Sequence, residues 1–340
     1  MTNIYGMTRD KLIEWLTSMG VKSFKAIQIF EWLYDKRVKS FDEMTNLKKD
    51  FIEELKKNFE FGNLVIKEKQ SNDTTLKYLF ELSDGNLIEA VVMKHDYGNS
   101  VCVSSQIGCN MGCAFCESGR LKKVRNLEAG EIVGQILAIE EDAKIRLSSV
   151  VVMGIGEPFD NYDNVLDFIR IINDAKGLAI GARHITVSTS GLVPKIREFS
   201  DFPYQVNLAV SLHAPNDEIR NKIMKVNKVY NIDTLIEAIK YYTKKTNRRV
   251  TIEYVMLNGV NDSEECAHEL ARLLKGMNVY VNLIPYNETS HLEFTKSKED
   301  TKMKFFDIIR KSGITITVRR EFGGNIDAAC GQLRAKGVKE

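Results

Sequence analysis

The stretch VCVSSQIGCNMGCAFC, residues 101–116, joins a short apolar run to three closely spaced cysteines. Residues 101–105 predict a β-strand, because the run is rich in valine and ends before a glycine. Three of the chain's six cysteines follow it within eight positions, in the spacing C-x3-C-x2-C. Reactive side chains directly after a strand are typical of folds that gather their chemistry at the carboxyl ends of strands. Such a fold requires further strands that end in the same way.

A repeat of strand and helix follows this stretch. Alternation of this kind implies βαβ units and a parallel sheet, and about six units suggest a barrel or partial barrel. The predicted strands are 101–105, 148–153, 184–189, 206–211, 250–256, 279–284 and 314–319. The predicted helices lie near 127–143, 160–174, 193–199, 216–223, 232–244, 262–275 and 299–311. Polar motifs follow several strands, and we expect them on one rim with the cysteines: GIGEP (154–158), STSG (188–191), SLH (211–213) and PYN (285–287).

The first part of the chain has a different pattern. Residues 1–60 read as amphipathic helices with their own aromatic core, and we expect a helical accessory domain there. Residues 61–94 alternate between apolar and polar, with Asp84-Gly85 as a hairpin signal, and predict a β-hairpin connection. The barrel is expected over 95–325, and a C-terminal segment over 326–340.

Composition narrows the class of protein. The 340 residues are 44% hydrophobic and 28% charged, with a net charge of +2, which fits a globular protein. No stretch approaches the roughly 18 apolar residues of a membrane span, and no signal-peptide profile precedes the helices. We therefore expect a cytoplasmic protein with reduced thiols, and a monomer. Basic runs at 120–125, 220–228 and 244–249 could contact a polyanion, or could be solvated surface.

Cys109, Cys113 and Cys116 fit an iron–sulfur cluster better than a structural zinc site. Zinc in a structural site takes four protein ligands, and no second pair with metal-ligand spacing follows nearby. An iron–sulfur cluster held by three thiolates would leave one iron open. From the residues alone, zinc and simple packing remain alternatives.

The spacing C-x3-C-x2-C, with Phe115 before the last cysteine, resembles the radical S-adenosylmethionine superfamily. The motifs VCVSSQIGC, GIGEP, RHITVSTSG, AVSLHAPN, NLIPYN and IDAACGQLRAK resemble the bacterial adenine-C2 methyltransferases of ribosomal and transfer RNA. The resemblance covers nearly the whole chain. It implies a partial (βα)6-type radical barrel in which the three cysteines hold a [4Fe–4S] cluster and S-adenosylmethionine fills the open iron. It also implies that the N-terminal helices bind RNA.

The same resemblance implies a set of site residues. Those that would contact the cosubstrate are Gly156, Glu157, Ser188, Ser211, Leu212, His213 and Asn287. Each of these could also be an ordinary residue of a strand end or turn. The resemblance also implies that Glu89, in the apolar run LIEAVV, is the proton acceptor. A carboxylate in such a run is costly unless it is exposed, paired or functional.

Two further cysteines would carry the methyl transfer. The resemblance implies that Cys330 takes a methyl from one S-adenosylmethionine, while the cluster cleaves a second one to generate a radical on that methyl. The methylene radical would add to C2 of an adenine in 23S ribosomal RNA or transfer RNA. Cys102 would then attack the Cys330 sulfur, releasing methylated RNA and leaving a disulfide that a flavodoxin- or ferredoxin-type reductant reopens. Without the resemblance, both cysteines read as buried small hydrophobes.

Three alternatives stay open. The sister family methylates adenine C8, confers antibiotic resistance and shares these cysteines. A radical activating enzyme would not need Cys102 and Cys330, and a zinc-stabilised RNA-binding protein would cleave no cosubstrate. Glu117 departs from the small residue that relatives often carry after the third cysteine, and Cys266 is expected to be core packing.

Overall fold

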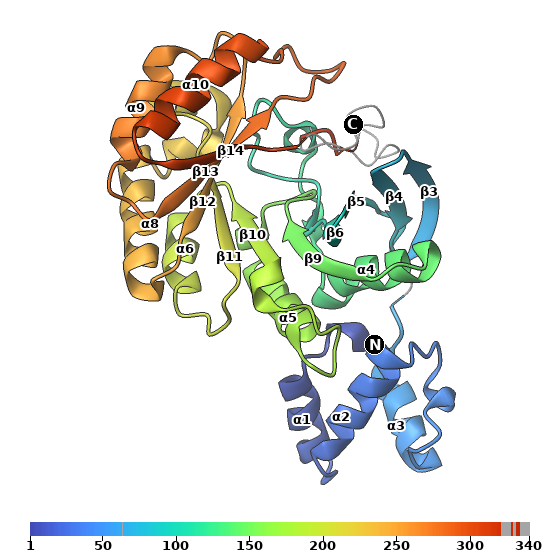
Figure 1. The fold of residues 1–340 in the computed structure, drawn as a ribbon. Helices are drawn as coiled ribbons and strands as arrows, with labels where there is room; N and C mark the ends of the chain where they lie inside the picture. The colour runs from blue at the N-terminus through green and yellow to red at the C-terminus, as the bar shows by residue number, and fades with distance from the viewer. Residues whose placement is uncertain (63, 321–327, 329–330, 334–340) are drawn as a thin grey trace.

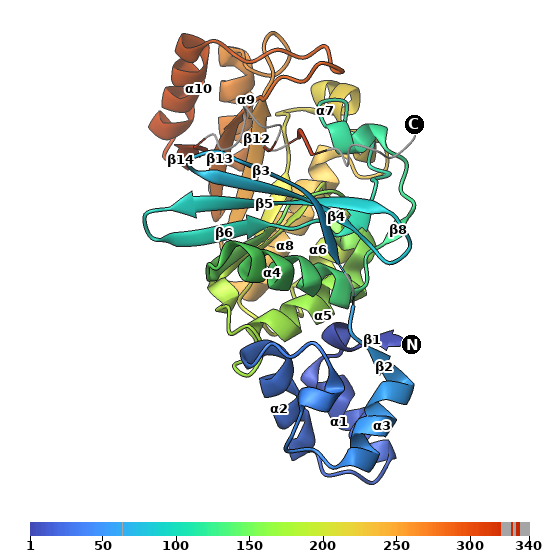
Figure 2. The same ribbon diagram turned by 90° about the vertical axis from the view of Figure 1, so that its right-hand side faces the viewer.

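The N-terminal residues form a small helical module. The computed structural model, which describes residues 1–62, 64–320, 328 and 331–333, places this module at one end of the molecule (Figures 1 and 2). Thr8 caps the first helix by accepting a hydrogen bond from the Lys11 amide at 3.2 Å. Its helices are α1 (Arg9–Ser18), α2 (Phe24–Phe30) and α3 (Lys49–Asn58), with a π-helical turn η2 (Glu31–Asp35) after α2.

The aromatic residues of this module pack on one another, as the sequence predicted. The rings of Trp15 and Phe59 lie 4.7 Å apart, centroid to centroid. The module also contacts the larger domain, where Gly6 lies so close to Gly130 of α4 (Ala129–Ala143) that a Cβ would come within 3.0 Å of its backbone nitrogen. An ion pair of 2.5 Å between Arg37 and Glu140 joins the same two parts.

The described residues form one ten-stranded sheet, ordered β14-β13-β12-β11-β10-β9-β6-β5-β4-β3. The pairings from β6 to β14 are all parallel, which confirms the predicted partial barrel. The parallel strands are β6 (Gly98–Cys102), β9 (Leu147–Val152), β10 (Ile185–Thr189), β11 (Asn207–Ser211), β12 (Val250–Met256), β13 (Val279–Pro285) and β14 (Thr315–Val318). Valine is the most frequent residue in these strands, as expected for a parallel sheet that helices cover.

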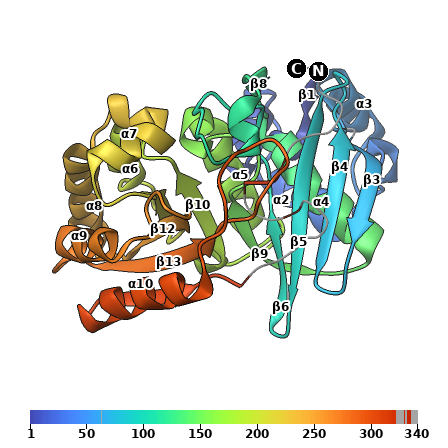
Figure 3. The same ribbon diagram turned by 90° about the horizontal axis from the view of Figure 1, so that it is seen from above.

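Helices cover the outer face of the parallel strands (Figure 1). Seen from above in Figure 3, the sheet curves around an interior. The helices that follow the barrel strands are α4, α5 (Tyr162–Asn173), α6 (Val193–Phe199), α7 (Asp217–Ile223), α8 (Ile232–Thr246), α9 (Glu264–Leu274) and α10 (Glu299–Lys311). Cys266 of α9 is buried in the hydrophobic core, as the sequence predicted.

The predicted hairpin extends the barrel, because its strands continue the same sheet. The strands β3 (Val65–Ser71), β4 (Thr75–Glu81) and β5 (Leu87–His95) are antiparallel, and β5 pairs with β6 at the edge of the barrel. The turn between β4 and β5 contains Asp84 and Gly85, with a φ of 78° at the glycine. Two short ladders lie outside this sheet: β1 (Thr2–Asn3) with β2 (Phe59–Glu60), and β7 (Gln106–Ile107) with β8 (Arg125–Asn126). Among the described ranges, no helix is long and apolar enough to cross a bilayer.

Candidate active site

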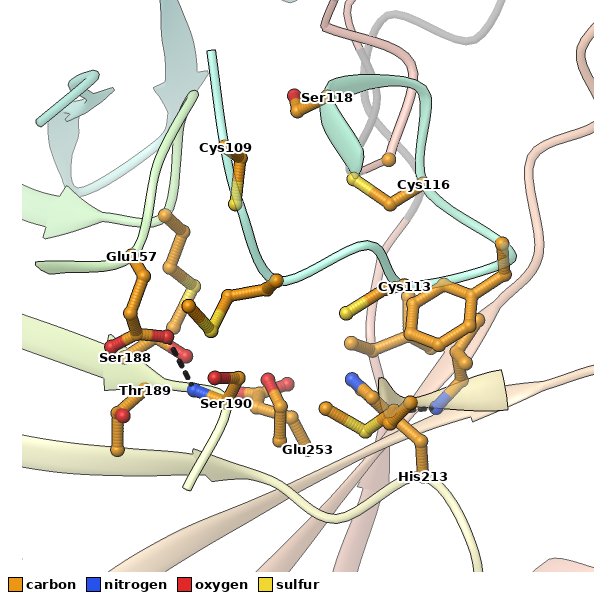
Figure 4. A pocket seen from close by; sticks show the side chains of 18 of the residues that line it. Cys109, Cys113, Cys116, Ser118, Glu157, Ser188, Thr189, Ser190, His213 and Glu253 are labelled. Atoms are coloured by element: carbon orange, nitrogen blue, oxygen red, sulfur yellow. Dashed lines mark hydrogen bonds between the residues drawn. The ribbon is translucent and has the colours of Figure 1, made fainter. Parts of the chain in front are cut away.

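A cavity opens where the parallel strands end. It encloses about 930 Å³, counting its open mouth, and the residues after β9, β10, β11 and β13 line it together with the cysteine loop. Figure 4 shows the three cysteines on one side and the polar strand-end residues on the other. The predicted residues that line it are Cys109, Cys113, Cys116, Gly156, Glu157, Ser188, Ser211 and His213. The motifs that the sequence analysis expected on one rim therefore surround one cavity.

The cysteine loop is held in place by its backbone. The Cys109 amide donates to the Leu121 carbonyl at 3.0 Å, and the Ala114 amide donates to the Ile223 carbonyl of α7 at 2.9 Å. Gly108 is needed for this path, since its φ is 71° and a Cβ there would lie 2.1 Å from the Lys122 carbonyl oxygen. The loop thus turns all three thiols toward the cavity rather than into the core (Figure 4).

The environment of the thiols disfavours bare thiolates. Burial raises the pKa of Cys109 to about 12 and that of Cys113 well above its ordinary value. A metal centre removes this penalty, because its positive charge holds the thiolate form. Across the part of the chain that the structure describes, no three His, Cys, Asp or Glu side chains gather closely enough to ligate one ion. Thiols that instead surround a shared space fit a cubane cluster, in which each cysteine has its own iron.

Glu157 is the best-defined polar group in the cavity. Its carboxylate is 3% exposed and accepts hydrogen bonds from the amides of Phe159 at 3.0 Å and Ser190 at 2.7 Å. Burial raises its pKa despite these donors. Gly156 has a φ of 112°, and a Cβ on it would lie 2.6 Å from the Gln106 side chain. This tight turn leaves a buried carboxylate that can bind an ammonium group.

His213 has an unusual backbone for a side chain with a Cβ. Its φ is 56°, in the left-handed region, and its Nδ1 accepts a hydrogen bond from the Val255 amide at 2.9 Å. Burial, followed by the charge of Arg220, lowers its pKa to about 3. The ring is therefore neutral, with its proton on Nε2, and can donate that proton to a ligand in the cavity.

Two predicted contacts do not line this cavity. Leu212 is fully buried in the core, so only its backbone lies near the strand end, where its amide donates to the Glu253 carbonyl at 3.1 Å. Asn287 lies in the turn after β13 and donates to the Pro285 carbonyl at 3.4 Å. Its side chain has the local hydrogen bond of a turn residue, which was the alternative reading of its sequence.

The sequence analysis missed Glu253, which lines the cavity. Thr189, Ser190 and Tyr286 also line it and belong to motifs that were expected on the rim, although they were not named as contacts. Glu253 is 4% exposed and burial raises its pKa, while the Asn282 amide donates to it at 2.8 Å. A signal was present, since Glu253 interrupts the apolar strand VTIEYVM in the same way that Glu89 interrupts LIEAVV.

Glu89 and Cys102 lie on a neighbouring face, formed by β4, β5 and β6. Cys102 pairs in register with Val91 of β5 and is buried in a cluster with Ile155, Ala328 and Leu333. Its side chain therefore faces away from Val101 and Val103, which pack in the main core. Glu89 lies on the same strand, two positions before Val91, so its side chain shares this face.

Glu89 has a buried cationic partner. Its Oε1 lies 3.0 Å from the Nζ of Lys77 on β4, and the two side chains are 2% and 5% exposed. The carboxylate in LIEAVV is therefore not an outward surface residue. The sequence left three explanations for this carboxylate: exposure, pairing or function. The structure shows pairing with Lys77, and a functional role remains a prediction.

Described residues near the C-terminus contact both the cavity and the Cys102 cluster: Gly331 lines the cavity, and Ala328 and Leu333 pack with Cys102. The Gly331 carbonyl accepts from the Glu117 amide at 2.8 Å, and the Leu333 carbonyl accepts from the Ser118 hydroxyl at 2.8 Å. Cys330 lies outside the described residues, and so does its predicted disulfide with Cys102. Among the described cysteines no disulfide is formed.

Glu117 and two residues of the basic runs, Lys123 and Arg220, are buried or paired in the structure. Glu117 is buried, with Arg120 and His291 each 3.4 Å from its carboxylate, so its charge is held beside the third cysteine. Lys123 pairs with Asp160 at 2.7 Å. Arg220, the first residue of the run 220–228, is completely buried and belongs to no solvated surface.

Comparison with known proteins gives the family. Residues 103–274 match the radical SAM superfamily, and residues 2–61 match the ribosomal RNA large subunit methyltransferase N-terminal domain. A probable dual-specificity RNA methyltransferase RlmN of Listeria welshimeri is 57% identical over 99% of this chain and 95% of its own length. One with the same description from Acholeplasma laidlawii is 54% identical, over 98% of this chain and 99% of its own.

A solved structure agrees with these relatives. A radical SAM methyltransferase from Sphaerobacter thermophilus superimposes with a TM-score of 0.92 at 43% identity, covering 99% of this chain and 100% of that one. The similarity thus includes the helical module, the sheet and the cavity. The chain belongs to the RlmN family of radical SAM RNA methyltransferases.

Proposed function

We propose that this protein methylates C2 of a specific adenine in 23S ribosomal RNA and in transfer RNA. The relatives described above are named dual-specificity RNA methyltransferases, which supports RNA as the substrate. The observation that carries the proposal is that one cavity gathers the three cysteines and the buried Glu157, beside a face that holds Cys102 and Glu89.

In this proposal the cavity binds the radical source. Cys109, Cys113 and Cys116 would hold a [4Fe–4S] cluster, and the Glu157 carboxylate would accept hydrogen bonds from the ammonium of S-adenosylmethionine. Ser188, Ser211 and the Nε2–H of His213 offer donors and acceptors to its nucleoside part. When bound, the cluster and cosubstrate supply a radical that can take hydrogen from a methyl group.

The chain's remaining residues would complete the transfer. Cys330 would carry the methyl donated by a first S-adenosylmethionine, so two molecules are used per turnover. Glu89 would accept the C2 proton, and Cys102 would attack the Cys330 sulfur to release the RNA. The resulting disulfide requires an external reductant, for which we propose a flavodoxin- or ferredoxin-type protein.

The domain assignments follow the same logic. We assign RNA binding to the helical module of residues 1–60, and methyl carriage to the segment 326–340. A single chain provides every proposed group, so the reaction needs only a monomer. It belongs in the cytoplasm, where reduced thiols and both RNA substrates occur together.

The test is the identity of the methylated nucleoside. Anaerobically reconstituted protein, S-adenosylmethionine, a chemical reductant and each RNA should yield 2-methyladenosine by mass spectrometry. 8-Methyladenosine as the sole product would replace this proposal with the sister activity. A Cys330→Ala variant that methylated at the parent's rate would overturn the covalent route.

A further inference from the structure

Arg220 of α7 is a completely buried arginine without an acidic residue among its hydrogen-bond partners. Its guanidinium donates to the carbonyl oxygens of Ser190 at 2.7 Å, Leu212 at 3.1 Å and Ser211 at 3.1 Å. Its Nη1 donates to the side-chain oxygen of Asn227 at 2.8 Å and, at 3.4 Å, to the carbonyl of Tyr230. Every one of these acceptors is neutral.

A buried charge in this situation is costly. Carbonyl groups solvate a guanidinium, but they carry no net charge to offset it. The nearest acid in the network is Asp217, which is one step removed because it accepts from the Asn227 amide at 2.8 Å rather than from Arg220. Burial lowers the pKa of Arg220 to about 10, so it stays protonated at neutral pH. An anion supplied by a ligand would offset the remaining charge.

The helix that carries Arg220 packs against the cysteine loop. The helix α7 is joined to that loop by the hydrogen bond between Ala114 and Ile223, and Ile223 packs in one cluster with Phe115 and Cys113. Arg220 also donates to the carbonyls of Ser190 and Ser211, and both serines line the same cavity as Cys113. The guanidinium is therefore close enough to act on whatever the cysteines hold.

The same side chain fixes the floor of the cavity. Ser190 directly follows β10, and Ser211 is the last residue of β11. Both line the cavity, and Ser190 is labelled in Figure 4. One guanidinium donates to both carbonyls, which joins the two strand ends. Gly191 permits this approach, because a Cβ there would lie 3.2 Å from Nη2 and its φ is 113°.

We propose that Arg220 is a positioning residue for the radical chemistry, with its buried charge stabilising the anionic, thiolate-bound cluster and its guanidinium fixing the cosubstrate-binding strand ends. The inference rests on the proposed function, since it takes the cluster and S-adenosylmethionine to be bound in this cavity. Reduction adds a negative charge to the cluster, and a nearby cation favours the reduced form. Arg220 therefore raises the cluster's reduction potential.

The experiment compares Arg220→Gln with Arg220→Lys. Midpoint potentials would be measured by anaerobic redox titration followed by electron paramagnetic resonance, and S-adenosylmethionine affinity by calorimetry. R220Q should titrate at a more negative potential than the parent and bind the cosubstrate about tenfold more weakly. R220K keeps the charge but loses the planar guanidinium, so its potential should stay near the parent's while its affinity falls.

A second variant tests the charge without touching the arginine. Asp217→Asn removes the acid one step away while keeping an oxygen for the Asn227 amide and the Ile232 amide, which lies 2.9 Å from it. D217N should shift the potential in the opposite direction, to a more positive value. Arg248→Gln is the matched control, because Arg248 bonds Asn207 at the other end of β11, 3.0 Å away, and should leave the potential unchanged.

The outcomes separate this inference from the proposed function. An unmodified protein that assembles no cluster, or binds no S-adenosylmethionine, contradicts the function itself. If the parent does both, a parent-like potential in R220Q overturns the role of Arg220. Equal shifts in R220K and R220Q would show that packing rather than charge is responsible. If R220Q does not fold, an unchanged potential in D217N overturns the electrostatic role.

Discussion

Two regions of the molecule each bury a carboxylate, and they satisfy it differently. In the strand-end cavity, Glu157 accepts from two backbone amides and has no cationic side chain bonded to it. On the face of β4, β5 and β6, Glu89 is 3.0 Å from the Lys77 ammonium. A buried carboxylate whose hydrogen-bond donors are all neutral can still attract a cationic ligand, whereas a carboxylate beside a lysine already has a cation that offsets its charge. This difference fits the proposal that the first region binds the cosubstrate and the second accepts the proton.

The largest expected effects come from removing one cysteine in each region. Cys113→Ala should abolish cluster assembly, cosubstrate cleavage and methylation together. Cys102→Ala should keep the cluster and cosubstrate cleavage but stop turnover, because the proposed enzyme–RNA adduct is not resolved. Iron and sulfide content, 5′-deoxyadenosine formation and a denaturing gel for the adduct measure these effects. Loss of the cluster in C102A would remove the distinction between the regions. Cys266→Ala, in the core and outside both regions, is the control.

Exchanging the two carboxylates for amides separates their roles. Glu89→Gln removes the proposed proton acceptor and should slow methylation by about 10²–10⁴-fold, with cosubstrate affinity unchanged. Glu157→Gln should instead weaken S-adenosylmethionine binding by about 10- to 100-fold, since it removes a charge-assisted hydrogen bond. Calorimetry and single-turnover methylation on each variant provide the comparison. Weaker cosubstrate binding in E89Q would contradict the separation.

The Lys77–Glu89 pair should also matter for stability. Lys77→Met removes the ammonium from a carboxylate that is 2% exposed, so the free energy of unfolding should fall by about 3 kcal/mol. The double variant Lys77→Met/Glu89→Gln should regain part of that loss, because it leaves no buried charge. Urea denaturation of the parent, both single variants and the double variant measures the coupling. Strictly additive losses would mean that the two side chains do not stabilise each other.

The sequence predicted the architecture well because local patterns specify it. Strand β10 was expected at 184–189 and occupies Ile185–Thr189, and helix α10 was expected and found at 299–311. These segments have strong apolar periodicity, and the polar residues that follow the strands are carried to one rim by the parallel topology. The cavity residues Glu157, Ser188, Ser211 and His213 were found for that reason.

The misses come from contacts that only the tertiary structure creates. Arg220 lies in the basic run RNKIMKVNK, and no local pattern shows that carbonyls from two strand ends will surround it. The apolar alternation of residues 61–94 predicted a hairpin but not that β5 would pair with β6 and extend the barrel sheet. Asn287 was assigned to the cosubstrate by resemblance; its side chain bonds the Pro285 carbonyl here, and its role stays a prediction.

The smallest expected effect is a pH dependence of stability that comes from His213. Its ring in the cavity is neutral, whereas the Lys77–Glu89 pair is charged. The ring's folded-state pKa of about 3 lies below the ordinary value of 6.5, so the neutral form stabilises the fold. This contribution is complete above pH 6.5 and is lost as the pH falls toward 3, by about 1.4 kcal/mol per unit. His213→Asn should flatten this dependence, because asparagine tolerates a φ of 56° and can accept from the Val255 amide without titrating.

Urea denaturation of the ligand-free protein at pH 7, 6 and 5 measures this dependence. The parent should lose stability faster than H213N between pH 6 and pH 5, and the two should differ least in slope near pH 7. Parallel stability curves would mean that His213 is not held neutral, and the contrast between its neutral ring and the charged Lys77–Glu89 pair would fail. A steeper parent curve would support a ring that keeps its Nε2 proton for the cosubstrate throughout the physiological range.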